Sequence, residues 1–202
     1  MTAVTRSTLL ERRTERNAMA EGFQLLDDKR LLLAGELLRE IARYTQLWRA
    51  FAIDCLRAGA ALREALERAG LQGLQCHPVD RVVAARLVLR ERRLFGVRVQ
   101  EAELHWRYDA APAAEQFSPE AERCREELRA LVAQAAVLAA LAGSLRRLGT
   151  EYRRTERRAR ALEDVLIPEA DANLRAIEEW LDEGEREESS CTHLASQRAT
   201  PA

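Results

Sequence analysis

The sequence predicts an all-α fold: two long helices packed as an antiparallel coiled coil, with a small β-hairpin inserted at the end opposite the termini. Aromatic residues make up 5% of the 202-residue chain and charged residues 32%, a balance typical of long helices. Two long stretches carry apolar residues at alternating steps of three and four, which is the spacing of a coiled-coil seam. Between them, Pro78 and Pro112 interrupt the pattern and indicate loops.

Residues 1–70 are expected to form the first helix. No proline occurs in this range, and its apolar stripe runs for about seven heptads. Two consecutive steps of four, through Leu33, Leu37 and Ile41, predict a local unwinding of the supercoil. Gly70 is expected to end the helix. The expected seam residues of this helix are Phe23, Leu26, Leu33, Leu37, Ile41, Tyr44, Trp48 and Phe51.

Residues 71–117 are expected to form an insert that contains a β-hairpin at about residues 82–100. The two predicted strands, Val82–Leu89 and Leu94–Val99, are rich in β-branched and apolar residues. The charged residues 90–93 are the expected turn, and Gly96 is expected to mark a bulge or a close backbone approach. Because an isolated hairpin is marginally stable in water, it should pack against a helix or a partner.

Residues 118–188 are expected to form the second helix, with Ser118 as its N-cap and Pro119 at its first position. Pro168 should kink or loosen this helix near Asp164, because proline lacks an N–H and clashes with the carbonyl four residues earlier. The expected seam residues are Leu138, Leu145, Tyr152, Leu162 and Leu166, and the stripe continues less strictly through Asn173, Ile177 and Trp180. Residues 189–202 are expected to be a disordered tail.

The two helices have similar lengths and a compact connection, so antiparallel pairing is the simplest packing. Residues that face each other should then have numbers that add up to about 188. At 1.5 Å per residue such a pair forms a shaft of roughly 100 Å.

No motif for chemistry is present: the sequence has no phosphate-binding loop, HExxH, GxSxG or GxGxxG motif. Because these motifs are absent and the histidines lack the spacing of metal ligands, no catalytic, cofactor-binding or metal-binding residue is expected. The net charge of −1 argues against a nucleic-acid binder.

The sequence predicts a cytoplasmic protein without direct membrane insertion. Its most apolar stretch, Ala130 to Leu145, is interrupted by polar and small residues and is interpreted as a buried coiled-coil segment. The start of the chain carries charges where a signal peptide needs an apolar run. The four cysteines are scattered, which fits free thiols in a reducing compartment.

Charge is distributed in two blocks along the second helix. Residues 146–160 hold seven arginines against two glutamates, whereas residues 163–188 hold eleven acids against two arginines. Lys29 is the only lysine in the chain. The blocks are either a solvated helix surface or a docking surface that meets different partners at different heights, and both interpretations stay open.

Several segments resemble the D subunit of the V/A-type ATPases. They are TRSTLL at residues 5–10, LLDDKR at residues 25–30, LFGVRV at residues 94–99, and RRTERRARALEDVLIPE at residues 153–169. The acidic residues 177–183 are similar to the family's C-terminal segment. The resemblance covers residues 5–188.

The resemblance implies a non-catalytic rotor shaft in the central stalk of a rotary ATPase, which transmits torque between the catalytic head and the membrane rotor ring in ATP-driven or ATP-producing ion transport, hydrogen ion transport included. The implied partners are the catalytic A and B subunits of the head, the small F subunit of the stalk and a membrane-side stalk subunit of the C/d type; no cofactor is implied. The implied place is cytoplasmic, peripheral to the membrane. The candidates for head contact are Arg6, Arg12, Arg13, Arg153, Arg154, Arg157, Arg158 and Pro168, and those for the lower stalk are Arg93, Phe95, Gly96, Val97 and Val99.

Two alternatives remain at this point. The first is a stand-alone coiled-coil adaptor or scaffold, which should dimerise stably on its own. The second is the helical arm of an enzyme, which the missing catalytic domain disfavours.

Overall fold

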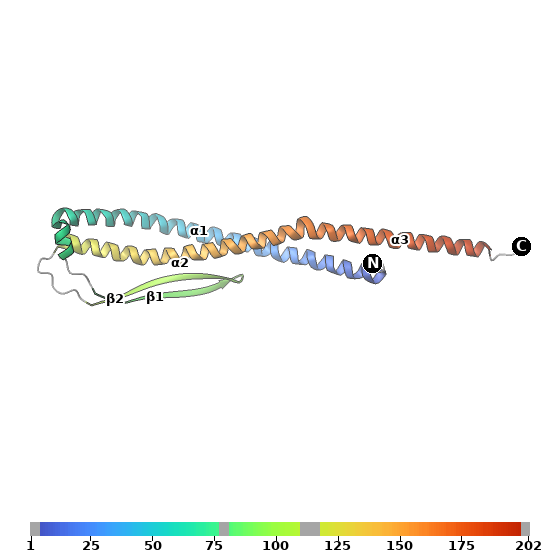
Figure 1. Cartoon of the computed structure of the whole chain (residues 1–202), viewed down its shortest axis with the longest axis horizontal. Coiled ribbons are helices and arrows are strands. Elements are labelled where there is room, and N and C mark those ends of the chain that lie inside the picture. The colour runs from blue at the N-terminus through green and yellow to red at the C-terminus, as the bar shows by residue number, and fades with distance from the viewer. Residues whose placement is uncertain (1–4, 77–80, 110–117, 199–202) are drawn as a thin grey trace. The chain divides into compact units, whose positions relative to one another are not determined.

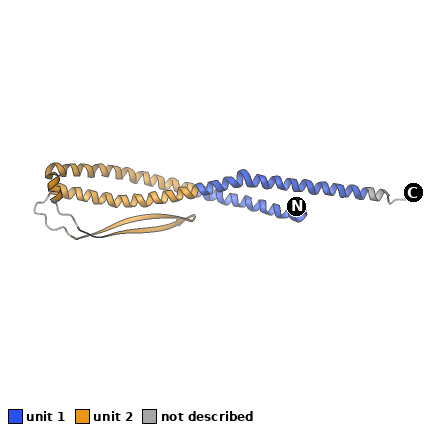
Figure 2. Cartoon of the chain, viewed as in Figure 1, with its two compact units in different colours: residues 1–32, 153–202 blue, residues 33–152 orange. Residues whose placement is uncertain are grey.

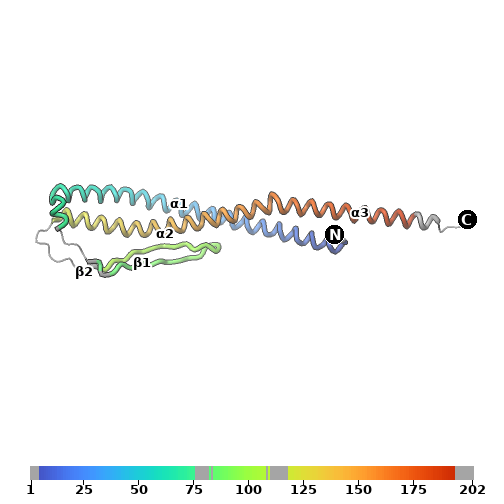
Figure 3. The backbone as a smooth tube through the Cα atoms, viewed as in Figure 1, coloured from blue at the N-terminus to red at the C-terminus, as the bar shows by residue number. Residues whose placement is uncertain are grey.

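The computed structural model describes residues 5–76, 81–109 and 118–198. The chain is mostly helical and contains one two-stranded hairpin (Figure 1, Figure 3). The elements in order are α1 (Arg6–Cys76), β1 (Arg81–Leu94), β2 (Val97–Asp109), α2 (Pro119–Ala161), a π-helical turn (Leu162–Leu166, the π-turn below) and α3 (Ile167–Arg198). They divide into two compact units (Figure 2): residues 33–152, the hairpin unit, and residues 1–32 with 153–202, the terminal unit.

In the hairpin unit, α1 and α2 run antiparallel side by side. Polar contacts between them include three in which Asp54 accepts from Gln134 at 2.7 Å, Arg57 donates to Glu127 at 3.0 Å, and Arg68 pairs with Glu120 at 3.1 Å. The numbers of each pair add up close to the value that the sequence predicts for antiparallel helices.

The core of the hairpin unit lies where the hairpin meets both helices. Leu33 of α1 and Leu148 of α2 are fully buried, and they pack with Val97 and Val99 of β2. A second buried cluster, which lies at the other end of the unit, is formed by Ala61, Ala65 and Cys124. Small side chains dominate this second cluster, so the two helices approach each other closely there.

Burial follows the predicted seam only in part. Leu33 and Leu138 are buried, whereas Ile41 and Trp48 are 48% and 50% exposed. The inward positions beside Ile41 are taken by two glutamates that face the hairpin and are described below. The other predicted seam residues outside the π-turn are half-buried: Phe23, Leu26, Leu37, Tyr44, Phe51, Leu145 and Tyr152.

The hairpin is longer than the sequence predicts, and its turn lies elsewhere. β1 continues through residues 90–93, and Leu94 pairs with Val97. The turn is formed by Phe95 (φ 48°) and Gly96 (φ 85°), which both have the positive φ that a two-residue hairpin turn of this hand requires. The expected bulge at Gly96 is therefore wrong, and the register shift of this hairpin lies between Val82 and Ala84.

The helix boundaries agree with the sequence at the start of α2 and differ elsewhere. The Ser118 hydroxyl accepts a hydrogen bond from the Ala121 N–H at 3.2 Å, as expected of an N-cap. Gly70 (φ 67°) interrupts α1, but helical structure resumes and continues to Cys76. The expected disordered tail is helical as far as Arg198, because no proline or glycine follows Gly184 before Pro201. Residues 199–202 of that tail, like residues 77–80 and 110–117 of the insert, lie outside the described residues.

One helical stretch between Pro119 and His193 is long and apolar enough, by length and composition, to cross a membrane; its most apolar window has a mean hydropathy of 1.7. From the sequence, we expect no stretch to be long and apolar enough to cross a membrane, and this helical stretch differs from that expectation. Core helices of soluble proteins pass the same test, so length and composition alone do not indicate a membrane span here.

Candidate functional site

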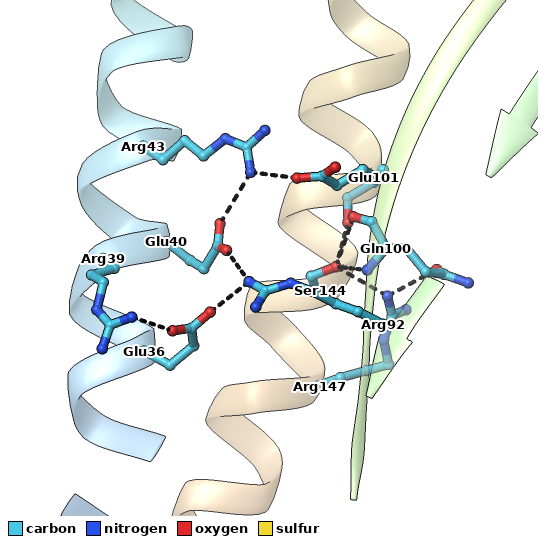
Figure 4. A network of polar contacts seen from close by, with 10 residues as sticks. Glu36, Arg39, Glu40, Arg43, Arg92, Gln100, Glu101, Ser144 and Arg147 are labelled. Atoms are coloured by element: carbon cyan, nitrogen blue, oxygen red, sulfur yellow. Dashed lines mark hydrogen bonds and ion pairs between the residues drawn. The ribbon is translucent and has the colours of Figure 1, made fainter. Parts of the chain in front are cut away.

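A charged network holds the hairpin against α1 (Figure 4). Arg92 of β1 donates to Glu36 at 2.6 Å and to Glu40 at 3.0 Å. Arg43 of α1 donates in return to Glu101 of β2 at 2.8 Å. Both glutamates of α1 are 5% exposed, and a buried carboxylate needs a charged partner to offset its lost hydration. On α1 itself, Arg39 pairs with Glu36 at 3.1 Å and Arg43 with Glu40 at 3.9 Å, so the hairpin and α1 together supply the charge that offsets this burial.

The electrostatics of the network follow from these hydrogen bonds. The hydrogen bond from Arg43 holds the pKa of the Glu101 carboxyl below its ordinary value, and the nearby charge of Arg92 acts in the same direction. The hydrogen bond to Glu36 raises the pKa of the Arg92 guanidinium. Both shifts favour the charged forms, so Glu101 and Arg92 keep their charges throughout the neutral pH range.

A second set of hydrogen bonds attaches β2 to α2 (Figure 4). The buried Ser144 hydroxyl accepts a hydrogen bond from the backbone N–H of Gln100 at 2.8 Å. Arg147 donates to the Arg98 carbonyl and to the Gln100 side-chain oxygen, both at 2.8 Å. These bonds occupy backbone groups on the outer edge of β2, which would otherwise be open to pairing with another strand.

The lower-stalk candidates of the sequence fall into two groups. Val97 and Val99 are 7% and 2% exposed, so they pack inside the hairpin unit. Arg93, Phe95 and Gly96 are exposed at the hairpin turn. The alternation of strand side chains explains the split, because Val97 and Val99 share one face of the hairpin with each other.

In the terminal unit, the arginines at the start of α1 are paired with carboxylates of α3. Arg6 pairs with Glu185, Arg13 donates to Glu178 at 2.5 Å, and Arg16 donates to Asp171 at 2.8 Å. These three carboxylates follow one another at steps of seven residues, the repeat of one side of a coiled-coil helix. We call the three pairs Arg6–Glu185, Arg13–Glu178 and Arg16–Asp171 the terminal ion pairs.

The terminal ion pairs shift the pKa values of their members. The hydrogen bond from Arg16 lowers the pKa of Asp171, and the hydrogen bond to Glu185 raises the pKa of Arg6. Arg12, the other arginine proposed for this end of α1, donates to Glu15 of its own helix at 2.8 Å. Much of the acidic block thus lies opposite the basic start of the chain, a relation that the heptad spacing and the antiparallel numbering could have revealed.

The remaining head-contact candidates lie on or beside the end of α2. Arg153, Arg154, Arg157 and Arg158 are exposed, and Pro168 is exposed on α3 just past the π-turn. Among the described residues, no group of three or more histidine, cysteine or acidic side chains is arranged to hold a metal ion.

Comparison with known proteins gives one consistent result. The family model for the D subunit of ATP synthase matches residues 8–194. The D subunit of the A-type ATP synthase of Pyrococcus abyssi is 29% identical to this chain, covering 91% of it and 87% of the relative. The D subunit of the V-type ATP synthase of an Anaeromyxobacter strain is 33% identical over 93% of this chain and 89% of the relative, and that of Deinococcus radiodurans is 30% identical over 91% and 82%. The chain belongs to the family of ATP synthase D subunits.

Proposed function

We propose that this protein is the central-stalk rotor shaft of a V/A-type rotary ATPase, and that it transmits torque between the catalytic head and the membrane rotor ring. The family match over almost the whole chain carries this proposal. The antiparallel helices support it, because a braced helix pair resists bending and twisting better than a single helix. We further propose that the two helices supercoil around each other along the predicted seam.

The charged surfaces suggest how the shaft meets its partners. The exposed Arg153, Arg154, Arg157 and Arg158 form a basic band on α2 that would face the A and B subunits of the head. Arg6 and Arg13 pair with α3 and Arg12 with its own helix, so in this proposal their contact with the head is secondary. The exposed hairpin turn at Arg93, Phe95 and Gly96 would lie toward the F subunit and the membrane-side stalk subunit.

The shaft has no chemical step of its own in this proposal and acts from the cytoplasmic side, peripheral to the membrane. ATP is made or hydrolysed in the head. The shaft biases the head sites between conformational states, because its surface differs around its axis and makes different contacts with each site.

Affinity purification from the native cell tests the proposal. A tagged chain is expected to recover A and B head subunits in a complex with ATPase activity. Recovery of a stable dimer of this chain without head subunits would instead support a coiled-coil scaffold and contradict the proposal.

Charge removal in the basic band tests the proposed head contact. Replacing Arg154, Arg157 and Arg158 by glutamine in the assembled complex should reduce ion transport per ATP hydrolysed. The matched control is Arg146→Gln, which removes an exposed arginine from the same helix outside the band. Unchanged coupling in the triple variant would contradict this contact.

A further inference from the structure

The π-turn changes which face of the helix lies inward. The Ile167 N–H donates to the Leu162 carbonyl, five residues back instead of four. Such a turn contains one residue more than an α-helical turn, so every later residue is rotated by about 100° around the helix axis.

Burial on α3 shows this rotation. The continued α-helical stripe predicts inward positions at Leu166, Asn173, Ile177 and Trp180. Ile177 is half-buried, but the other three are exposed, Leu166 by 41% and Trp180 by 68%. In each case the next residue along the chain is half-buried (Ile167, Leu174 and Leu181), and Ala170, Asp171, Ile177 and Glu178 complete the half-buried face. Leu181 lines a groove of about 480 Å³ together with Leu9 of α1, so it faces the partner helix.

Pro168 accounts for the position of the π-turn. It has no N–H to complete an α-helical bond, and its ring would clash with the Asp164 carbonyl in a regular α-helix. A wider turn immediately before it removes that clash. Asp164 lies inside the π-turn, which agrees with the loosening that the sequence predicts there.

The terminal ion pairs depend on the same rotation. Asp171, Glu178 and Glu185 lie beyond the π-turn and reach Arg16, Arg13 and Arg6 in the observed register. A rotation of about 100° would carry these carboxylates away from α1. The same rotation would bring Trp180 inward from the flanking groove of about 410 Å³ that it lines with Arg12.

We propose that the π-turn is a register switch for α3, and that Pro168 holds it in the observed position. In the first register Ile167, Leu174 and Leu181 face α1 and the terminal ion pairs form. In the second, α2 and α3 form one regular helix, Leu166, Asn173 and Trp180 face α1, and the ion pairs are broken.

Fluorescence of Trp180 reports the register directly. In a full-length background carrying Trp48→Phe and Trp106→Phe, only Trp180 emits. Pro168→Ala is expected to shift its emission to the blue and to reduce its quenching by acrylamide. The control Pro119→Ala alters a proline at a first helical position, where no α-helical bond is lost, and should leave Trp180 exposed.

A rescue variant separates the register from other effects of the proline. Deletion of the exposed Val165 removes the extra residue of the π-turn, and Pro168→Ala removes the proline that requires the wider turn. The residues after the deletion should then lie on the same faces of a regular α-helix as in the observed structure. This variant should restore the exposure of Trp180. It should also restore the energetic coupling between Arg13 and Glu178 in a double-mutant cycle, a coupling that Pro168→Ala alone should abolish.

Two results would overturn the proposal. One is a Pro168→Ala variant in which Trp180 stays as exposed as in the parent and the Arg13–Glu178 coupling persists. The other is burial of Trp180 in the deletion variant. Helix content measured by circular dichroism accompanies each variant and detects a folding failure. If the phenylalanine background does not fold, the coupling cycle decides between the registers in the chain that keeps all three tryptophans.

Discussion

The hairpin unit and the terminal unit hold paired helices together in different ways. In the hairpin unit, Leu33, Leu148 and two valines of β2 form a dry cluster, and buried carboxylates are matched by Arg92. Of the residues that the structure describes in the terminal unit, only Thr155 and Ala159 are buried. There, the helices contact each other through half-buried apolar residues and the terminal ion pairs, of which Arg16–Asp171 is partly buried and the other two are exposed. The comparison teaches that one pair of helices can combine a firmly packed segment with one that ionic conditions can loosen.

The largest expected effect concerns the core of the hairpin unit. Leu148→Ala removes a fully buried side chain and should lower the free energy of unfolding by about 2–5 kcal/mol. Leu128→Ala, at a position of the same helix that is 46% exposed, is the control and should cost far less. Urea denaturation followed by circular dichroism measures both, and equal losses would contradict the contrast between core and surface.

The next effect concerns the charge that the hairpin supplies. Arg92→Ala leaves Glu36 and Glu40 buried without this partner and should cost about 1–3 kcal/mol. Adding Glu36→Gln and Glu40→Gln should recover much of this loss, because neutral amides need no counter-charge. A triple variant that is less stable than Arg92→Ala would show that the arginine acts through packing.

A smaller effect is expected in the terminal unit. Arg13→Ala breaks an exposed ion pair and should lower the free energy of unfolding by about 0.2–1 kcal/mol. The loss should shrink in high salt, because ions screen exposed charges, whereas the loss in Leu148→Ala should not. Hydrogen exchange at the start of α1 in low and high salt measures this loss of stability. A loss of the same size in low and high salt would show that Arg13 does not stabilise the terminal unit through its charge.

The smallest expected effect is a pH dependence. The pKa of Asp171 is lowered from 3.8 in the folded chain by its hydrogen bond with Arg16. Its contribution to stability is therefore fully present above the unfolded value of 3.8 and is lost as the pH falls through the folded value. The wild-type chain should lose more stability than Arg16→Ala over this acid range. Parallel pH titrations of the unfolding free energy for the two proteins test the difference.

The sequence predicts local signals and the pairing of the helices well. The Ser118 cap depends on adjacent residues, and the antiparallel numbering depends only on the lengths of two helices and their connection. The position of the hairpin turn is harder to predict, because the charged residues 90–93 resemble a turn. In the structure, Arg92 has carboxylate partners on α1 that keep it in a strand.

The candidate site is harder to predict than the fold, for two physical reasons. Part of the charge that offsets the burial of Glu36 and Glu40 comes from an arginine more than fifty residues away in the sequence, so periodicity alone identifies both positions as solvent-facing. A stripe of constant period also fails at Leu166, Asn173 and Trp180, because the single extra residue of the π-turn rotates the helix beyond it. Pro168 indicates an irregularity near Asp164, but it does not indicate the direction of the change.

The arginine side chains that form ion pairs in both units also determine which contacts keep their charge at high pH. Lys29 is the only lysine, and each ion pair described above between separate elements uses an arginine. Arginine stays protonated at every pH at which proteins remain folded, and reagents or enzymes that modify amines cannot remove its charge. A rise in pH therefore leaves these ion pairs charged, and burial raises the pKa of the Cys124 thiol, so this thiol also resists ionisation in base.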